Sequence, residues 1–222
     1  MLKVDHLTIG YDSRDLVRDI SFELAPGECV LLAGPNGTGK TTLLRALAAE
    51  GVVLIPTNIP KVKGFTVEAF VRTGCYRESD WRGRISKEVE GRMEEALKML
   101  GIEELKGREI STLSDGEFQK ACLATGLTRR AEVLLLDEPT AHLDVENRID
   151  VLRTLREVAR KTGTAVLFSS HDLHDALQVA DRVFVLTRDG RFLASASVIS
   201  SEVEKSKADV LQAAFATLSD LR

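Results

Sequence analysis

The sequence has little of what marks secreted or membrane-spanning proteins. Of its 222 residues only Cys29, Cys75 and Cys122 are cysteines, and they are odd in number, far apart and without metal-type spacing. We expect reduced thiols that fill the core of a cytosolic protein. No apolar run approaches the length of a membrane-spanning helix, and "VLLL" at 133–136 is typical of the longest. The first residues, "MLKVDHLTIGYD", contain no apolar region of a secretory signal.

Excess positive charge is also missing. The formal net charge is −4 and the isoelectric point is near 5.7, so the chain has no general attraction to nucleic acid or anionic lipid. No basic stripe with interleaved aromatic residues is present, which argues against a nucleic-acid partner. The 44% apolar and 29% charged residues are typical of a globular protein with one domain, or one domain with a small lobe.

What is present is an alternation of short apolar strands with amphipathic helices. This pattern predicts an α/β fold in which helices cover a parallel sheet. The expected strands are 2–11, two around the Pro26-Gly27 turn, 52–56, 132–139, 164–170 and 182–190. The expected helices between them are 41–50, one from Ser114, 145–161 and 172–180.

The middle of the chain, from about 58 to 124, predicts a helical lobe inserted into this core. Helices are expected over 67–74 and 86–101. The second places four apolar residues on one face: Val89, Met93, Leu97 and Leu100. No linker separates independent domains, so we expect a single domain over 1–222 with its core lobe at about 1–57 and 125–222.

A complete phosphate-binding loop, "GPNGTGKTT", lies between a predicted strand and a predicted helix. Its glycines allow successive N–H groups to point at phosphate oxygens, and the helix N-terminus adds partial positive charge. Lys40 is expected to reach the β- and γ-phosphates, and Thr41 to bind Mg²⁺. The alternative, a turn that merely joins strand to helix, does not explain the complete motif. The expected nucleotide-binding residues are Gly34, Pro35, Asn36, Gly37, Thr38, Gly39, Lys40, Thr41 and Thr42.

Two later strands also end in polar residues. The apolar run "VLLL" ends in Asp137 and Glu138, and buried strands rarely end on paired carboxylates without a cation. We expect Asp137 to bind Mg²⁺ and Glu138 to orient or deprotonate an attacking water, although Asp-Glu-Pro is also plausible turn chemistry. "SSHD" at 169–172 places His171 at the same edge of the sheet, within reach of a γ-phosphate, with Asp172 as a helix cap.

The segment "LSDGEFQK" at 113–120 is explained locally by a capping box of Ser114 and Glu117. However, the phosphate loop, "LSDGE", Asp-Glu, "AHLD" and "SSHD" occur in an order that closely resembles the ATP-binding cassette (ABC) ATPases. The resemblance covers nearly the whole chain. It implies a RecA-like P-loop NTPase core with an inserted helical subdomain and a reduced N-terminal β-subdomain, with ATP and Mg²⁺ as cofactors.

The resemblance assigns further residues. Ser114 and Gly116 would contact the ATP of a second copy across a head-to-tail homodimer. Tyr11 matches the aromatic residue that stacks on adenine, and packing in the core is the alternative. Asp144, in "AHLD", would lie at the dimer seam and is also a good cap for the next helix.

The helical lobe looks most like that of importers for iron-siderophore, haem or cobalamin. This likeness implies a homodimer on the cytoplasmic face of the membrane, bound to integral-membrane permease subunits and served by a substrate-binding protein. Two alternatives share every nucleotide motif. One is a soluble ABC ATPase for cofactor assembly or repair, and the other is an ATP-switched dimerisation module with weak hydrolysis.

The sequence departs from the family pattern in three ways. Thr57 replaces a glutamine that touches Mg²⁺ or the lytic water, which leaves a metal-binding role for Thr57 in doubt. Only residues 43–56 separate Thr42 from Thr57, so either the β-lobe is trimmed or a loop is omitted. Asp115 and Glu117 replace the commoner glycine and glutamine, and acids repel a triphosphate unless they point away.

Overall fold

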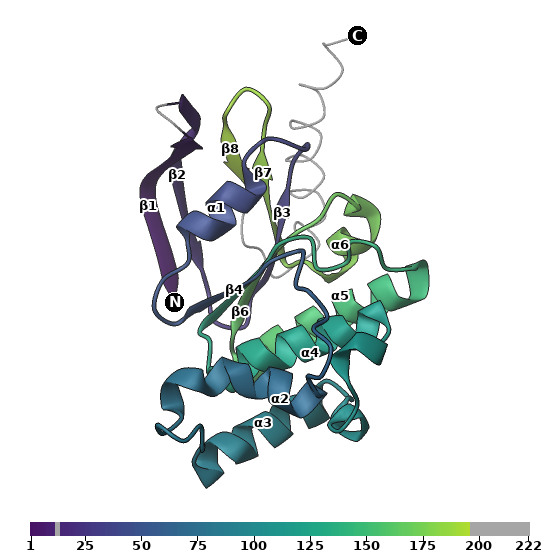
Figure 1. Cartoon of the computed structure of the whole chain (residues 1–222). Helices are drawn as coiled ribbons and strands as arrows, with labels where there is room; N and C mark the ends of the chain where they lie inside the picture. The colour runs from purple at the N-terminus through teal and green to yellow at the C-terminus, as the bar shows by residue number, and fades with distance from the viewer. Residues whose placement is uncertain (12–13, 196–222) are drawn as a thin grey trace.

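The computed structural model describes residues 1–11 and 14–195 and contains two sheets (Figure 1). In the smaller sheet, β1 (Leu2–Tyr11) pairs antiparallel with β2 (Arg14–Leu24). The larger has six strands in the order β4-β5-β6-β3-β7-β8. Their bounds are β3 (Cys29–Ala33), β4 (Val52–Ile55), β5 (Val133–Leu136), β6 (Ala165–Ser169), β7 (Arg182–Leu186) and β8 (Phe192–Ala194). The sequence also predicts a helix from about Ser200 to Arg222, and this segment lies outside the described residues.

The six-stranded sheet is parallel from β4 to β7, and β8 runs antiparallel to β7. Every residue of β3, β5 and β6 is buried, because both faces of these strands are covered. The expected α/β fold is therefore confirmed. Strand β8 was not predicted; its three residues are too few for a periodic pattern to stand out.

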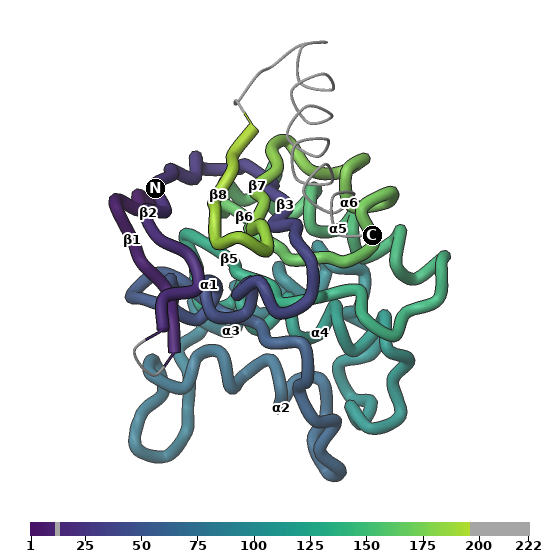
Figure 2. Tube along the Cα trace, turned by 90° about the horizontal axis from the view of Figure 1, so that it is seen from above, coloured from purple at the N-terminus to yellow at the C-terminus, as the bar shows by residue number. Residues whose placement is uncertain are grey.

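The small sheet together with α1 covers one face of this sheet, and the remaining helices cover the other (Figures 1 and 2). On β3, Leu32 faces a core shared with the β1–β2 sheet and α1 (Lys40–Ala46). Leu31 faces the other way, into a core shared with the remaining helices. The remaining helices are α2 (Val67–Arg72), α3 (Lys87–Met99), α4 (Asp115–Thr128), α5 (Val145–Thr162) and α6 (Leu173–Val179).

The middle of the chain is helical, as expected. Helices α2 and α3 pack on α4, joined by short 3₁₀ turns: η1 (Thr73–Glu78), η2 (Glu103–Leu105) and η3 (Ile110–Thr112). The apolar face expected for α3 is confirmed, since Val89, Met93, Leu97 and Leu100 are all buried, and the last three belong to one core cluster. Helix α4 continues to Thr128, so it crosses residue 124, where the helical lobe was expected to end.

The N-terminal β-subdomain is small, as expected. Between α1 and β4 the chain makes only a short turn and forms no additional strand across residues 47–51. The β1–β2 sheet is thus the only sheet besides the six-stranded one among the described residues. Residues 43–56 therefore contain most of α1, the short turn after it and β4.

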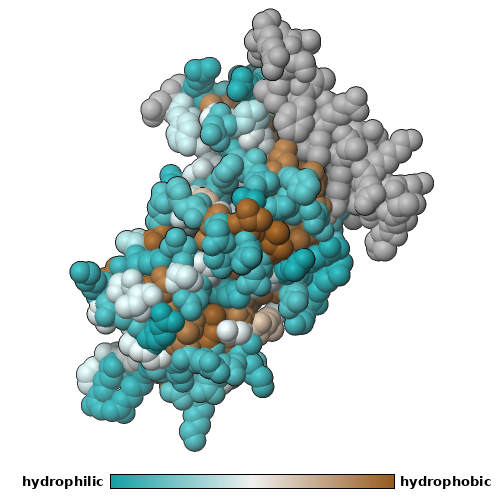
Figure 3. Space-filling view, turned by 90° about the vertical axis from the view of Figure 1, so that its right-hand side faces the viewer, coloured by the Kyte–Doolittle hydropathy of each residue, from teal (hydrophilic) through white to brown (hydrophobic). Residues whose placement is uncertain are grey.

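Within 1–11 and 14–195, no helix is both long and apolar enough to cross a membrane. The face seen in Figure 3 is mainly hydrophilic, and its hydrophobic side chains gather in patches between polar ones.

We predict that iodoacetamide labels none of the three cysteines readily in the folded protein. The side chains of Cys29, Cys75 and Cys122 are buried, and burial raises the pKa of Cys122 to about 12, so its reactive thiolate is scarce at neutral pH. Mass spectrometry of protein labelled at pH 7.5 should show no rapid addition, whereas protein in urea should gain one label at each cysteine. Rapid labelling of any cysteine in the native state would contradict this packing.

Candidate nucleotide-binding site

The strand order brings the predicted site residues to one edge of the sheet. Strands β4, β5, β6 and β3 are successive parallel neighbours, so their carboxyl ends lie side by side. Thr57 follows β4, Asp137 and Glu138 follow β5, the "SSHD" segment follows β6, and the phosphate loop follows β3. Residues up to about 140 positions apart in the sequence thereby form one site.

The phosphate loop depends on glycine at particular positions. Gly34 has a φ of 146°, and a Cβ atom there would lie 2.4 Å from the carbonyl oxygen of Leu186. Gly39, the residue before α1, has a φ of 99°. These values lie outside the regions that residues with a Cβ atom ordinarily adopt. A Cβ atom at Gly37 would meet nothing within 4 Å, so the loop is open on that side.

Lys40 places a buried cation inside this loop. Its side chain is nearly buried, and its ammonium donates to the carbonyl oxygens of Gly34 at 2.8 Å and Pro35 at 3.3 Å. Burial lowers the pKa of Lys40, while the carboxylates of Glu138 and Asp137 act in the opposite direction. A cation that has lost most of its water at the N-terminus of a helix suits a phosphate group.

Asp137 is the centre of the hydrogen-bond network. Its Oδ2 accepts a hydrogen bond from the Thr41 hydroxyl at 2.8 Å, and its Oδ1 accepts one from Ser169 at 2.9 Å. Ser169 in turn accepts the main-chain N–H of Glu138 at 2.8 Å. No group of three or more His, Cys, Asp or Glu side chains that could hold a metal ion by themselves exists among the residues described. Thr41 and Asp137 suit Mg²⁺, which usually binds one or two carboxylates together with phosphate oxygens and water.

Glu138 and His171 form a pair beside this network. The His171 Nδ1 atom lies 2.8 Å from Glu138 Oε2, which also accepts the main-chain N–H of His171 at 3.3 Å. Glu138 has a φ of 49°, an uncommon value for a residue with a side chain, and such values often occur at functional sites. The Glu138 side chain is 17% exposed and that of His171 is 65% exposed, so the pair lies at the opening of the site.

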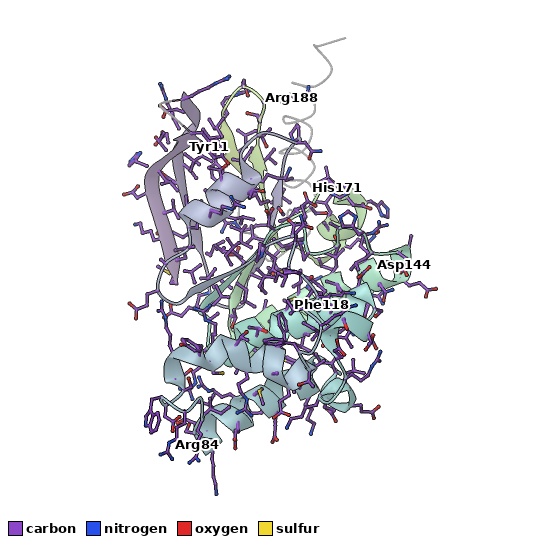
Figure 4. All side chains as sticks on the ribbon, in the orientation of Figure 1. Tyr11, Arg84, Phe118, Asp144, His171 and Arg188 are labelled. Atoms are coloured by element: carbon purple, nitrogen blue, oxygen red, sulfur yellow. The ribbon has the colours of Figure 1, made fainter. Side chains whose placement is uncertain are left out.

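The cavity at this edge has a volume of ≈ 310 Å³ and is lined by the phosphate loop with Tyr11, Thr57, Asp137 and Glu138. Tyr11 is 56% exposed, so the alternative that it packs in the core is wrong. Its hydroxyl is hydrogen-bonded to that of Thr42. Figure 4 shows Tyr11 just above α1 and His171 farther to the right.

Thr57 lines the cavity and makes one hydrogen bond to the turn after the neighbouring strand. Its hydroxyl donates to the main-chain oxygen of Asp137 at 2.8 Å. Thr57 therefore stabilises the turn that carries Asp137 and Glu138. The short threonine side chain finds its hydrogen-bond partner in the residue after the neighbouring strand, Asp137. A glutamine side chain is two atoms longer and would reach farther from the main chain.

Ser114 and Gly116 lie apart from this cavity. The capping box is confirmed, because Ser114 Oγ accepts the N–H of Glu117 at 3.2 Å and Glu117 Oε2 accepts the N–H of Ser114 at 2.8 Å. That second bond is the main cause that lowers the pKa of Glu117. Gly116 is buried, and a Cβ atom there would lie 2.8 Å from Asn147 Oδ1. Ser114 is exposed and does not line the phosphate-loop cavity.

Sequence reasoning missed Ser169 and was partly wrong about Asp172. The available signal for Ser169 was a hydroxyl near the end of the apolar strand predicted at 164–170. Asp172 is the residue before α6, but its side chain makes no capping hydrogen bond and pairs instead with Arg148 at 3.1 Å. Asp144 does cap α5, since its carboxylate accepts the N–H of Asn147 at 2.8 Å.

Comparison with known families decides what these features belong to. Residues 17–141, more than half of the chain, match the protein-family model described as "ABC transporter". The protein belongs to the ABC transporter ATP-binding family. This membership agrees with the phosphate loop, the Asp137–Glu138 strand end and the Ser114 capping box, which are all present in the fold.

Named relatives cover most of this ABC protein. It is 32% identical over 213 residues to the petrobactin import ATP-binding protein FpuC of Bacillus anthracis, covering 85% of this chain and 78% of the relative. It is 35% identical over 202 residues to the zinc import ATP-binding protein ZnuC of Roseobacter denitrificans, covering 84% and 75%.

Solved structures show the same fold. A nucleotide-free ATP-binding cassette from an ABC transporter matches with a TM-score of 0.78 and 18% identity, covering 95% of this chain and 96% of that one. The cbiO1 protein of Clostridium perfringens, part of the ABC transporter complex cbiONQ, matches with a TM-score of 0.77 and 22% identity, covering 99% and 97%.

We predict that Ser169→Ala lowers the free energy of unfolding by about 1–3 kcal/mol, because it removes the partner of the partly buried Glu138 N–H and of one buried Asp137 oxygen. Urea unfolding followed by circular dichroism measures the change. Ser21→Ala is the matched control, since the Ser21 hydroxyl also accepts a main-chain N–H, that of His6, but is exposed. It should cost less than about 0.5 kcal/mol. Equal losses in both variants would contradict the bridging role of Ser169.

Proposed function

We propose that this chain is the ATP-binding and ATP-hydrolysing subunit of an ABC importer, bound as a homodimer to permease subunits on the cytoplasmic face of a membrane. The observation that carries the proposal is the joint placement of Lys40, Thr41, Asp137 and Glu138 around one cavity. Relatives named for the import of petrobactin and of zinc support the direction of transport, and a further relative is named for achromobactin transport. A metal or metal-chelate cargo, such as an iron-siderophore, is the class we favour.

The residues divide the chemistry between them. The phosphate-loop N–H groups and Lys40 would hold the β- and γ-phosphates, and Thr41 with Asp137 would hold Mg²⁺. The ion supplies positive charge that offsets the charge of the phosphates. Glu138 would accept a proton from the attacking water or orient it, because its carboxylate lies at the opening of the site. His171 keeps the Glu138 carboxylate in place through Nδ1.

A second copy would complete the site. Ser114 is exposed at the N-terminus of α4 and lies outside the cavity of its own chain. A helix N-terminus with free N–H groups favours an anion. We propose that the Ser114 loop contacts the γ-phosphate of ATP held by a partner chain. Two ATP molecules would then lie between the two copies. Closure of the dimer would then move the permease, and hydrolysis would reopen it.

We predict that Glu138→Gln lowers ATP turnover by about 10²–10⁴-fold while the affinity for ATP is retained, because the amide cannot accept a proton from water. Phosphate release measures turnover, and a fluorescent ATP analogue measures affinity. Glu146→Gln is a suitable control, since Glu146 is exposed in the first turn of α5. Near-normal turnover of Glu138→Gln would exclude Glu138 as the base.

Pull-down of the tagged protein from its own membranes in mild detergent, followed by mass spectrometry, tests the transporter assignment. Co-purification of a polytopic membrane protein is the expected result, and the family of that protein would identify the cargo class. Recovery with soluble partners alone would contradict the assignment and favour an ABC ATPase of cofactor assembly or repair. The assignments within the nucleotide site would be unaffected.

A further inference from the structure

The loop at the N-terminus of α4 carries two acids where an anion is proposed to bind. Asp115 directly follows Ser114, and Glu117 follows Gly116. A carboxylate within a few ångströms of a triphosphate is repulsive unless a cation offsets its charge. The surroundings of each acid therefore matter for the proposed dimer.

Both acids are paired with cations that also hold the main chain of the loop. The Lys61 ammonium lies 2.6 Å from Asp115 Oδ1 and donates to the carbonyl oxygen of Leu113 at 2.8 Å. Arg108 makes the corresponding pair on the other side, where Nη1 lies 3.3 Å from Glu117 Oε1 and Nη2 donates to the carbonyl oxygen of Thr112 at 3.0 Å. Each acid is thus neutralised by a cation that is fixed to the same loop.

Lys61 is more restrained than an ordinary surface lysine. Its side chain is 26% exposed, whereas that of Asp115 is 62% exposed. Its ammonium lies 5.4 Å from the centre of the Phe118 ring, and Figure 4 shows Phe118 in the middle of the molecule. The contacts with an aromatic face and with a main-chain oxygen stabilise one position of this long side chain. They offset the entropy that is lost when the side chain is held there.

We propose that Lys61 is a positioning residue for the ATP of a partner chain, and that Asp115 is compatible with this role only because Lys61 neutralises it. The inference rests on the proposed function, in which the Ser114 loop faces a second copy. Lys61 lies in the segment that follows Thr57. This segment contacts the Ser114 loop through the hydrogen bond from Lys61 to the carbonyl oxygen of Leu113. Loss of the Lys61 charge would leave the Asp115 carboxylate unpaired and facing the γ-phosphate.

The test measures dimer formation with MgATP in a chain that carries Glu138→Gln, so that ATP persists. Sedimentation equilibrium gives the dimer dissociation constant of this parent and of its variants. Lys61→Met should raise that constant about tenfold or more, which corresponds to at least 1.4 kcal/mol. Adding Asp115→Asn to Lys61→Met should restore it to within about threefold of the parent, and Lys61→Arg should stay in that range.

Lys63→Met is the matched control, because Lys63 lies in the same segment, is exposed, and its loss changes the net charge equally. It should dimerise as the parent does. The affinity for a fluorescent ATP analogue at low protein concentration should be unchanged in all variants, because Lys61 does not line the phosphate-loop cavity. If Lys61→Met does not fold, Lys61→Gln takes its place.

Two results would overturn the inference and leave the proposed function intact. One is parent-like dimerisation of Lys61→Met, and the other is a double variant that stays as weak as Lys61→Met alone. A parent chain that stays monomeric with MgATP at all concentrations would instead overturn the proposed ATP-bridged dimer, and the role of Lys61 with it.

Discussion

The site depends on one buried carboxylate that is held from three sides. Thr41 on the phosphate loop and Ser169 at the end of β6 each donate to the Asp137 side chain, and Thr57 behind β4 donates to its main-chain oxygen. A buried carboxylate is costly unless its oxygens are hydrogen-bonded, so these contacts fix the relative positions of β3, β4, β5 and β6 at this edge. The same arrangement places the nucleotide-binding residues.

Much of this was predictable because the signals are local. The phosphate loop has a complete motif whose glycines adopt the backbone conformations that the motif requires. Asp137 and Glu138 end a fully buried strand, and the capping box at Ser114 is a pattern of four residues. The neighbours of these residues were not predictable. The Ser169 bridge and the direction of the Thr57 hydroxyl depend on which strands lie adjacent, and no local pattern records that.

The acids near Ser114 also have neighbours that could not be predicted from the sequence. From sequence, Asp115 raised a question of repulsion that only the placement of Lys61, 54 residues earlier, answers. The family likeness could not supply this contact, because it concerns a residue that departs from the family pattern. The net charge around the Ser114 loop therefore depends on residues that the fold brings to it, whereas the backbone conformation of the loop follows from its own residues.

We propose that two copies of this chain enclose ATP between the phosphate loop of one and the Ser114 loop of the other. The most direct test is an experimental structure of the Glu138→Gln chain with MgATP. The account predicts a head-to-tail dimer in which Ser114 Oγ of one copy lies within about 3 Å of the γ-phosphate bound by Lys40 of the other. Nucleotide bound in the phosphate loop, with the Ser114 loop of every copy away from it, would contradict the account.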